Sequence, residues 1–443
     1  MSAVRLARRI MSKPRKVVIS FDTHTPYLAF RVSRLAAEIR RRGLEDQIQL
    51  RVILIAGKES TYGWEGSEFE KQYGGVPVKV LTKTFRGLGL RGYFRLTTVK
   101  TTLKFFWNLI KMRPKIVFVG GYDRPESMIA GFTAWLFRWR VGVMHDSRFN
   151  DAESFSKSVV LERLKSHVLR RYHFFMCSGN ECVDYSHFLA GRKKPAYHGG
   201  WNVVDNEAIG ERASDPAGDE AIYQHLGVKE GEPFFLMAIR FIAKKNVETV
   251  LDAYASYRAK AASKPAKLVI CGQGELEETY REKIAELNLG DDVAIVPWLE
   301  YNQVPRASRL SLSVILASTH DQWGLIVNEA LAAGAPVLIS DRCGAHELVQ
   351  NGVNGFTFAP RDADHLAVLL GEVAERDGLV DRLRENAAPS MRTFSIEQFL
   401  DACFAAFGHF GLLPEEPAAQ EISEKHKEAA AAPPTARHGT TTT

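Results

Sequence analysis

Short runs of apolar residues alternate with longer amphipathic segments along most of the chain. In the first half the apolar runs lie at 16–21, 49–57, 115–121, 140–145 and 174–179. The segments between them, such as 29–43 and 158–172, repeat their apolar residues every three or four positions, which predicts helices. We therefore expect buried parallel strands joined by crossover helices in this half.

The second half of the chain repeats this alternation. Its apolar runs lie at 234–240, 267–274, 293–298, 312–318 and 336–341. Two such series predict an α/β protein with two Rossmann-like, doubly wound domains, each binding its ligand at the carboxyl ends of its strands. The cleft between the two domains is the expected site.

Changes in composition suggest where the domains begin and end. The turn-rich segment 212–220 places the hinge near 195–220, and no core pattern is visible after about residue 412. Five parts follow, namely a basic segment at 1–14, an N-terminal domain at 15–200, a C-terminal domain at 201–390, a helix at 391–412 and a disordered tail at 413–443.

Overall composition excludes several classes of protein. Apolar residues make up 45% of the chain and charged residues 25%, as in ordinary globular proteins. The five cysteines are scattered, without zinc spacing, which favours a reducing, cytoplasmic setting. The basic N-terminus is not followed by the apolar segment of a signal peptide. The longest apolar run, near 128–137, covers about half a membrane span, so we do not expect an integral membrane protein.

Positive charge is concentrated in one region. Between Lys71 and Gly121 the chain has eleven Lys or Arg residues and no Asp or Glu, and aromatic and aliphatic residues lie among them. Over 83–112 this pattern is typical of a helix that rests on an anionic membrane surface. A helix that packs on its own sheet with a basic outer face is an alternative, and a nucleic-acid patch is a third, although we expect no nucleic acid partner.

Two carboxylates flank the start of one predicted helix in the second half. Asp321 precedes the Trp-Gly turn, and Glu329 lies inside an otherwise apolar helix that ends near Gly334. The amides of Gly324 and Leu325 at the helix start are suited to bind phosphate. Glu329 can accept hydrogen bonds from a ribose diol, and Asp321 would face the group beyond the phosphates. These residues predict a site for a nucleotide diphosphate that carries a second sugar.

A pair of cations follows another strand of this half. Arg240 and Lys245 lie where the strand at 234–240 ends, and two fixed positive charges there suit a departing diphosphate. The nearby Gly272 and Gly274 do not form a dinucleotide fingerprint, because Glu277 stands where the third glycine belongs.

These motifs together resemble family 4 retaining glycosyltransferases of the GT-B fold. The resemblance rests on Asp321-x7-Glu329, on Arg240 with Lys245, on the turn at 351–356 and on "WNVVD" at 201–205. It extends over about 200–390 and is fainter over 15–200. It implies an acceptor-binding N-terminal domain, a donor-binding C-terminal domain and a C-terminal helix that returns to the N-terminal domain.

The resemblance also implies roles for single residues. Arg240 and Lys245 would hold the donor diphosphate, Glu329 the ribose, and the backbone at Leu299 would lie against the base. Asp321 would touch the donor sugar, and His145, at the end of a strand, would lie near the sugar's C6 hydroxyl. Asp321 departs from the family's glutamate, which shortens its reach by about one methylene.

The resulting hypothesis is a glycosyltransferase of glycan, polysaccharide or glycolipid biosynthesis. It would move a sugar from a nucleotide diphosphate sugar, of the UDP or GDP type, to an acceptor hydroxyl, with retention and without metal or cofactor. A lipid-linked acceptor would place the protein on the cytoplasmic face of a membrane. A nucleotide-sugar-binding protein without activity is the alternative, because Asp321 replaces the usual glutamate. A nicotinamide-dependent oxidoreductase is a third, disfavoured by the missing glycine fingerprint.

Overall fold

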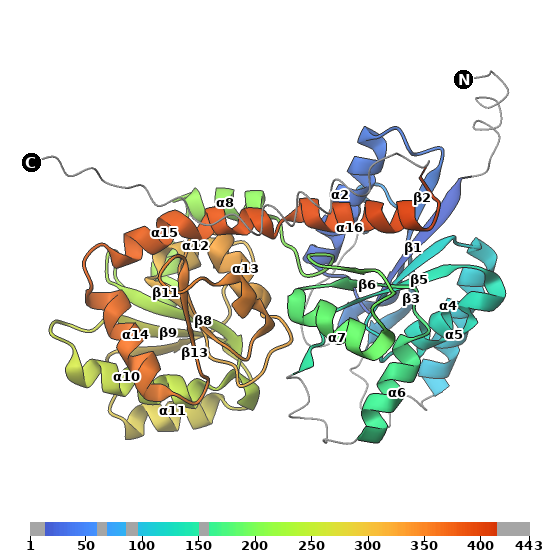
Figure 1. Cartoon of the computed structure of the whole chain (residues 1–443). Helices are drawn as coiled ribbons and strands as arrows, with labels where there is room; N and C mark the ends of the chain where they lie inside the picture. Colours follow the sequence, from blue (N-terminus) through green and yellow to red (C-terminus); the bar gives the residue numbers. More distant parts are fainter. Residues whose placement is uncertain (1–13, 60–68, 86–95, 150–158, 414–443) are drawn as a thin grey trace, which may run out of the picture.

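The computed structural model describes residues 14–59, 69–85, 96–149 and 159–413. Within these residues the chain forms two parallel β-sheets with helices on both faces of each, and the two sheets lie in separate parts of the molecule (Figure 1). We call the parts the N-terminal half, up to Tyr197, and the C-terminal half, from Asn206. The predicted α/β fold with two Rossmann-like units is thus confirmed.

The first sheet has the strand order β3-β2-β1-β4-β5-β6-β7. Its strands are β1 (Arg15–Phe21), β2 (Ile48–Glu59), β3 (Val78–Phe85), β4 (Ile116–Gly120), β5 (Arg140–His145), β6 (Phe174–Cys177) and β7 (Ala196–Tyr197). The helices are α2 (Pro26–Arg41), α3 (Phe69–Gln72), α4 (Leu96–Met112), α5 (Pro125–Phe137), α6 (Val159–Leu169) and α7 (Asn180–Ala190).

Alternating residues of the central strands build two core layers on this sheet. Val17 and Ile19 of β1 pack with Leu28 and Val32 of α2 on one face. Val18 packs on the opposite face, in the layer that contains the inner residues of α4, α5, α6 and α7. Because both faces are covered, the central strands read as continuous apolar runs.

The second sheet has the order β10-β9-β8-β11-β12-β13. Its strands are β8 (Phe234–Arg240), β9 (Lys267–Gln273), β10 (Val293–Val296), β11 (Ser313–Leu316), β12 (Val337–Ser340) and β13 (Gly355–Phe358). Its helices are α8 (Asn206–Ser214), α9 (Asp219–Leu226), α10 (Val247–Lys260), α11 (Glu277–Glu286), α12 (Val304–Leu310), α13 (Leu325–Ala332), α14 (Ala363–Glu375) and α15 (Leu379–Ser390), with short 3-10 turns at Ala243–Lys245, Gly344–Leu348 and Met391–Thr393.

The last helix, α16 (Ile396–His409), returns to the N-terminal half, as the resemblance implied (Figure 1). A capping box of Ser395 and Gln398 starts it. The ring of Phe407 lies 6.3 Å from that of Phe118 in β4, and Phe410 lies 5.3 Å from Phe174 in β6. These aromatic contacts fix the helix to the first sheet.

The chain passes from the first sheet to α8 between residues 198 and 205. The domain bounds of 15–200 and 201–390 stay a prediction. The predicted basic segment and tail fall almost wholly on 1–13 and 414–443, outside the described residues. No helix among the described residues has the length and apolar character that crossing a membrane requires.

Candidate active site

The carboxylate of Glu329 lies where the two halves meet. The residue is in the second turn of α13 and is only 6% exposed. Tyr27 of α2 donates a hydrogen bond from its hydroxyl to Oε1 at 2.7 Å. Burial raises the pKa of Glu329 to about 7, although the Tyr27 hydrogen bond and the charge of Arg212 act in the opposite direction. Glu329 is therefore a buried carboxylate with a hydroxyl partner, as a ribose-binding residue would be.

The start of α13 is suited to bind an anion. Gly324 precedes the helix with φ 103°, and no side chain caps the first turn. A Cβ at this position would come within 2.6 Å of Leu316 Cδ2, so the turn needs glycine. The first amides of the helix, those of Gly324 and Leu325, belong to the positive end of the helix dipole. The helix start thus has no side-chain cap, and phosphate binding by its amides stays a prediction.

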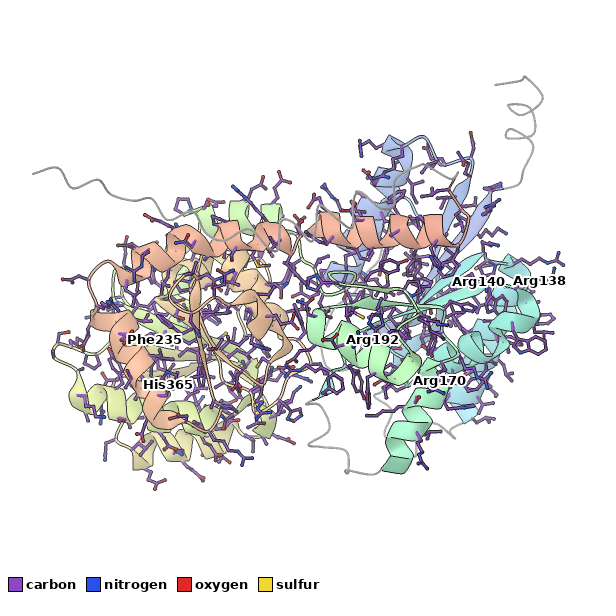
Figure 2. All side chains as sticks on the ribbon, in the orientation of Figure 1. Arg138, Arg140, Arg170, Arg192, Phe235 and His365 are labelled. Carbon is purple, nitrogen blue, oxygen red and sulfur yellow. The ribbon has the colours of Figure 1, made fainter. Side chains whose placement is uncertain are left out.

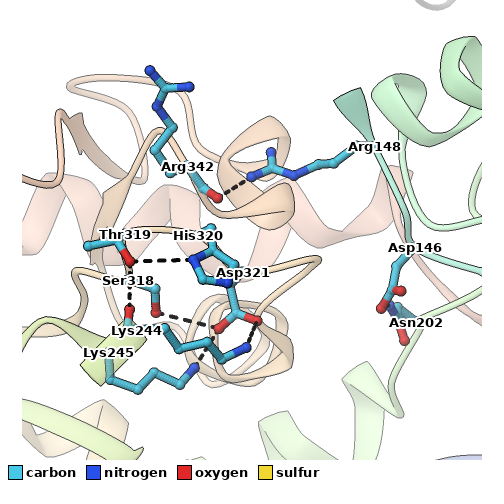
Figure 3. Close-up of polar contacts among 10 residues, drawn as sticks. All are labelled: Asp146, Arg148, Asn202, Lys244, Lys245, Ser318, Thr319, His320, Asp321 and Arg342. Carbon is cyan, nitrogen blue, oxygen red and sulfur yellow. Dashed lines mark hydrogen bonds and ion pairs between the residues drawn. The ribbon is translucent and has the colours of Figure 1, made fainter. Parts of the chain in front are cut away.

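Asp321 lies between two lysines (Figure 3). Lys245 Nζ is 2.5 Å from Oδ2 and Lys244 Nζ is 3.4 Å from Oδ1. Burial acts to raise the pKa of the carboxyl, but the two lysines outweigh it, and the pKa lies below its ordinary value. Asp321 therefore stays charged and holds Lys245 in place. Lys244 was missed by the sequence analysis, since the motif singles out only Lys245.

The order of strands explains why these residues meet. β8 and β11 are neighbours in the sheet. Arg240 ends β8 and the turn with both lysines follows it, while Asp321 follows β11. The backbone of Asp321 is fixed to the loop after β12, because its N–H donates to Arg342 O at 3.1 Å and its carbonyl accepts from Gly344 N at 3.0 Å. The carboxyl ends of parallel strands thus bring distant charges to one edge.

Two other parts of the predicted site are structurally constrained. Leu299 is 6% exposed, and its N–H donates to Cys271 Sγ at 3.2 Å, which fixes the backbone expected beside the base. At Gly272 a Cβ would lie 1.9 Å from Ile239 O, so this glycine permits close approach of β8 and β9. That role agrees with the absence of a dinucleotide fingerprint.

His145 points into the N-terminal half in this structure. Its ring is 4% exposed, its Nε2 is 2.9 Å from Ser186 Oγ in α7, and its Nδ1 is 3.6 Å from Cys182 Sγ. The rings of Tyr122 and Phe175 pack around it. Every contact described for the ring comes from its own half of the chain, so contact with the donor sugar stays a prediction.

His145, Cys177 and Cys182 are residue types that can bind metal, and their ligand atoms lie within 4.8 Å of one another. All three are buried against the core of the first sheet. Hydrogen bonds among these residues and with Ser186 satisfy their polar atoms, which accounts for their placement.

Asp146, the next residue, faces the other half and was missed by the sequence analysis. Asn202, which lies beside Asp146 in Figure 3, donates from Nδ2 to Asp146 Oδ2 at 3.2 Å. The same nitrogen donates to Ser178 Oγ at 2.9 Å. Burial raises the pKa of Asp146, and the negative charge of Asp321 acts in the same direction. Strand alternation was the available signal, because Val141, Val143 and His145 share one face of β5 and the following residue turns to the other.

Further contacts join the halves beside these residues. A guanidinium nitrogen of Arg148 donates to the carbonyl of Arg342 (Figure 3). The carboxylate of Glu347 accepts hydrogen bonds from Asn180 N at 2.7 Å and Glu181 N at 3.0 Å. Glu347, from the C-terminal half, thus caps the start of α7 in the N-terminal half. Such contacts join residues far apart in the chain and have no sequence signature.

Comparison with known proteins finds a matching family and several relatives for the C-terminal half. The model of the family "Glycosyl transferases group 1" matches residues 219–389. Alpha-D-kanosaminyltransferase of Streptomyces kanamyceticus is 25% identical over 160 residues, which cover 36% of this chain and 41% of that protein. Alpha-monoglucosyldiacylglycerol synthase of Streptococcus pneumoniae is 26% identical over 201 residues, 44% of this chain and 45% of that protein. The matched segment thus spans less than half of each relative.

Solved structures extend the likeness to the whole fold. The structure of HepE from Anabaena in complex with UDP-glucose superposes with a TM-score of 0.65 at 17% identity, covering 88% of this chain and 99% of that one. Sucrose-phosphate synthase from Thermosynechococcus elongatus gives a TM-score of 0.66 at 15% identity, with 89% and 98% covered. The fold is GT-B, and residues 219–389 match the family of glycosyl transferases group 1.

Proposed function

We propose that the protein transfers a sugar from a nucleotide diphosphate sugar to an acceptor hydroxyl, with retention of configuration and without a metal ion. The observation that carries this proposal is the arrangement of Lys245, Asp321 and Glu329. Two oppositely charged groups meet at the ends of β8 and β11, and a buried carboxylate follows on the helix that begins there. No apolar packing role explains one buried and two partly buried ionisable side chains at one sheet edge.

Arg240, Lys245 and the amides of Gly324 and Leu325 stabilise the departing diphosphate in this proposal. Negative charge on the phosphate oxygen grows as the bond to the sugar breaks, and fixed cations and amides act on that charge without reorganising. Asp321 keeps Lys245 in position and reaches the donor sugar from the same loop. Its lowered pKa keeps the carboxylate charged for this role.

The nucleoside is held by Glu329 and Leu299. The Glu329 carboxylate accepts hydrogen bonds from the ribose hydroxyls, in the way it accepts one from Tyr27. The backbone at Leu299, fixed by Cys271, lies against the base. We propose UDP as the first nucleotide to test, because the similar Anabaena structure contains UDP-glucose.

The N-terminal half would present the acceptor. Asp146 and Asn202 face the donor side, while His145 supports the strand end beneath them. In the reaction the bond between the anomeric carbon and the phosphate oxygen breaks. The acceptor oxygen bonds to that carbon from the same face, and its proton passes to the leaving phosphate. Orientation of the donor by these side chains acts on turnover.

We propose a reducing, cytoplasmic compartment, and the cysteines support this proposal. All five are free and buried in the described residues. Free thiols in every position support a reducing, cytoplasmic setting.

The test is release of nucleotide from UDP-, GDP-, ADP- and dTDP-sugars by the wild-type protein and by Glu329→Ala. Release from one donor that is lost in the variant supports both the donor and the site. Equal release by both proteins would contradict the assignment of Glu329. Tight donor binding without release, with a panel of sugar and lipid acceptors present, would favour a binding protein instead.

A further inference from the structure

Large apolar side chains gather on the outside of the N-terminal half. Of fourteen exposed large apolar residues in the described part of the chain, eight lie on α4 and α5. They are Leu96, Val99, Leu103, Trp107, Phe132, Trp135, Leu136 and Phe137, and Trp135 is 76% exposed. We call this surface the α4–α5 face. Contiguous exposed apolar surface on a globular protein marks an interaction site.

Most of these side chains lie outside the core, although Phe137 stacks on the buried Trp139. α4 packs on its sheet through Thr101, Phe105 and Leu109. Phe106 joins the two helices by an edge contact with Phe137, at 5.6 Å between ring centroids. Between the same two helices, the Thr102 hydroxyl donates a hydrogen bond to the Glu126 carboxylate at 2.9 Å. The inner surfaces of both helices are therefore packed against the protein, and their outer apolar residues can contact another partner.

Cations surround the apolar residues of the face. The exposed ones are Lys100, Lys104, Lys111, Arg113, Arg138 and Arg140. Figure 2 shows Arg138 and Arg140 together at the outer edge of the N-terminal half. Lys111 Nζ lies 5.6 Å from the ring of Trp107, so charge and aromatic surface are directly adjacent. The one acidic residue within α4 and α5 is Glu126, which is buried.

We propose that the α4–α5 face rests on the surface of an anionic lipid bilayer. Aromatic and aliphatic side chains enter the headgroup region, and the surrounding cations bind anionic headgroups. A symmetric contact between two copies of this face would place its six cations against six others, which disfavours a dimer. A nucleic acid would use the cations but leave the aliphatic residues exposed.

The structure extends the sequence prediction of a membrane contact at 83–112. Residues 86–95 lie outside the described part, and α4 supplies only half of the face. α5, which the prediction did not include, adds Trp135 and Leu136 and the cations that follow the helix. The proposal does not depend on the proposed enzymatic activity.

The test is flotation of the full chain with vesicles of phosphatidylcholine, with and without phosphatidylglycerol. We expect the wild type to float with the anionic vesicles and to be released by high salt, because salt screens the cations. Lys100→Gln with Lys104→Gln should weaken binding about fivefold for each cation removed. Trp107→Glu with Trp135→Glu should abolish flotation.

The control is Val368→Glu on α14, which changes a residue that is 55% exposed but lies in the C-terminal half. It should float as the wild type does. Circular dichroism of each variant checks that the fold is kept. Absence of flotation with either vesicle overturns the proposal, as does flotation that the α4–α5 variants leave unchanged. A wild-type dimer that Trp107→Glu dissociates would assign the face to a second copy and also overturn it.

Discussion

The two halves of this molecule share one architecture but place their charges differently. In the C-terminal half, charged groups lie partly buried at the carboxyl ends of the strands, as in Lys245 with Asp321. In the N-terminal half, charge lies on the outer α4–α5 face, and the strand end holds a buried histidine and a carboxyl with a raised pKa.

This difference indicates which kind of binding site can be recognised from the amino-acid sequence. A diphosphate needs cations and helix amides at fixed spacing, so the C-terminal half carries a recognisable motif. An acceptor site depends on which side chains of irregular loops meet across an interface, and such loops carry no short motif.

The largest effect should come from the partly buried pair of Lys245 and Asp321. Lys245→Ala removes a cation proposed to bind the departing phosphate, and we expect kcat for nucleotide release to fall about 10²- to 10³-fold. Lys264→Ala, which changes a lysine that is 74% exposed and pairs with Glu232, is the control and should keep wild-type turnover. A fall of less than threefold for Lys245→Ala would place the phosphates elsewhere.

The next effect concerns the pH dependence of stability. Burial raises the pKa of Glu329 from 4.5 to about 7 in the folded protein. Between these values the folded state binds more protons than the unfolded state, so the contribution of Glu329 to stability falls as pH rises through this window. Glu329→Gln removes that dependence. Its free energy of unfolding, relative to that of the wild type, should therefore rise by up to about 3 kcal/mol from pH 4.5 to pH 7.5. Urea unfolding of both proteins at pH 4.5 and pH 7.5 measures the difference in their free energies of unfolding. The same difference at both pH values would contradict the prediction.

Parts of the comparison between halves were visible in the sequence and parts were not. The ten apolar runs all became strands, because central strands buried on both faces are continuously apolar. Three edge strands were missed. β3 (Val78–Phe85) carries alternating polar residues and lies within the basic stretch, β7 (Ala196–Tyr197) is only two residues long, and β13 (Gly355–Phe358) is only four residues long. An edge strand has one neighbour and therefore a weaker apolar pattern.

The candidate site shows the same division. Lys245, Asp321 and Glu329 follow from spacing along one half of the chain, while Tyr27 and Asp146 come from the other half. The Tyr27–Glu329 hydrogen bond joins residues 302 positions apart. Residue patterns report periodicity and local spacing, so they cannot indicate which loops of two separate sheets will meet.

A smaller effect tests that contact between the halves. Tyr27→Phe removes one hydrogen bond to a buried carboxylate and should lower the free energy of unfolding by about 1.5–3 kcal/mol at pH 8. A double-mutant cycle with Glu329→Gln should give a coupling energy of about 1 kcal/mol or more. Additive effects of the two substitutions would show that the halves do not meet at this pair in solution.

The smallest effect concerns the cap on α7. Glu347→Gln weakens the acceptor for two backbone amides and should cost about 1 kcal/mol in urea unfolding. The matched control is Glu385→Gln, an exposed glutamate of α15 in the same half, which should be neutral. Equal values for the two variants would mean that Glu347 does not cap the helix.

The central claim is that the C-terminal half binds a nucleotide diphosphate through Lys245 and Glu329. Calorimetric titration of the wild type, Lys245→Ala and Glu329→Ala with UDP, GDP, ADP and dTDP tests it directly. The account predicts that one nucleotide binds the wild type and that each substitution weakens binding at least tenfold, since each removes a charged hydrogen-bond partner. No binding of any of the four to the wild type, or equal binding by all three proteins, would contradict it.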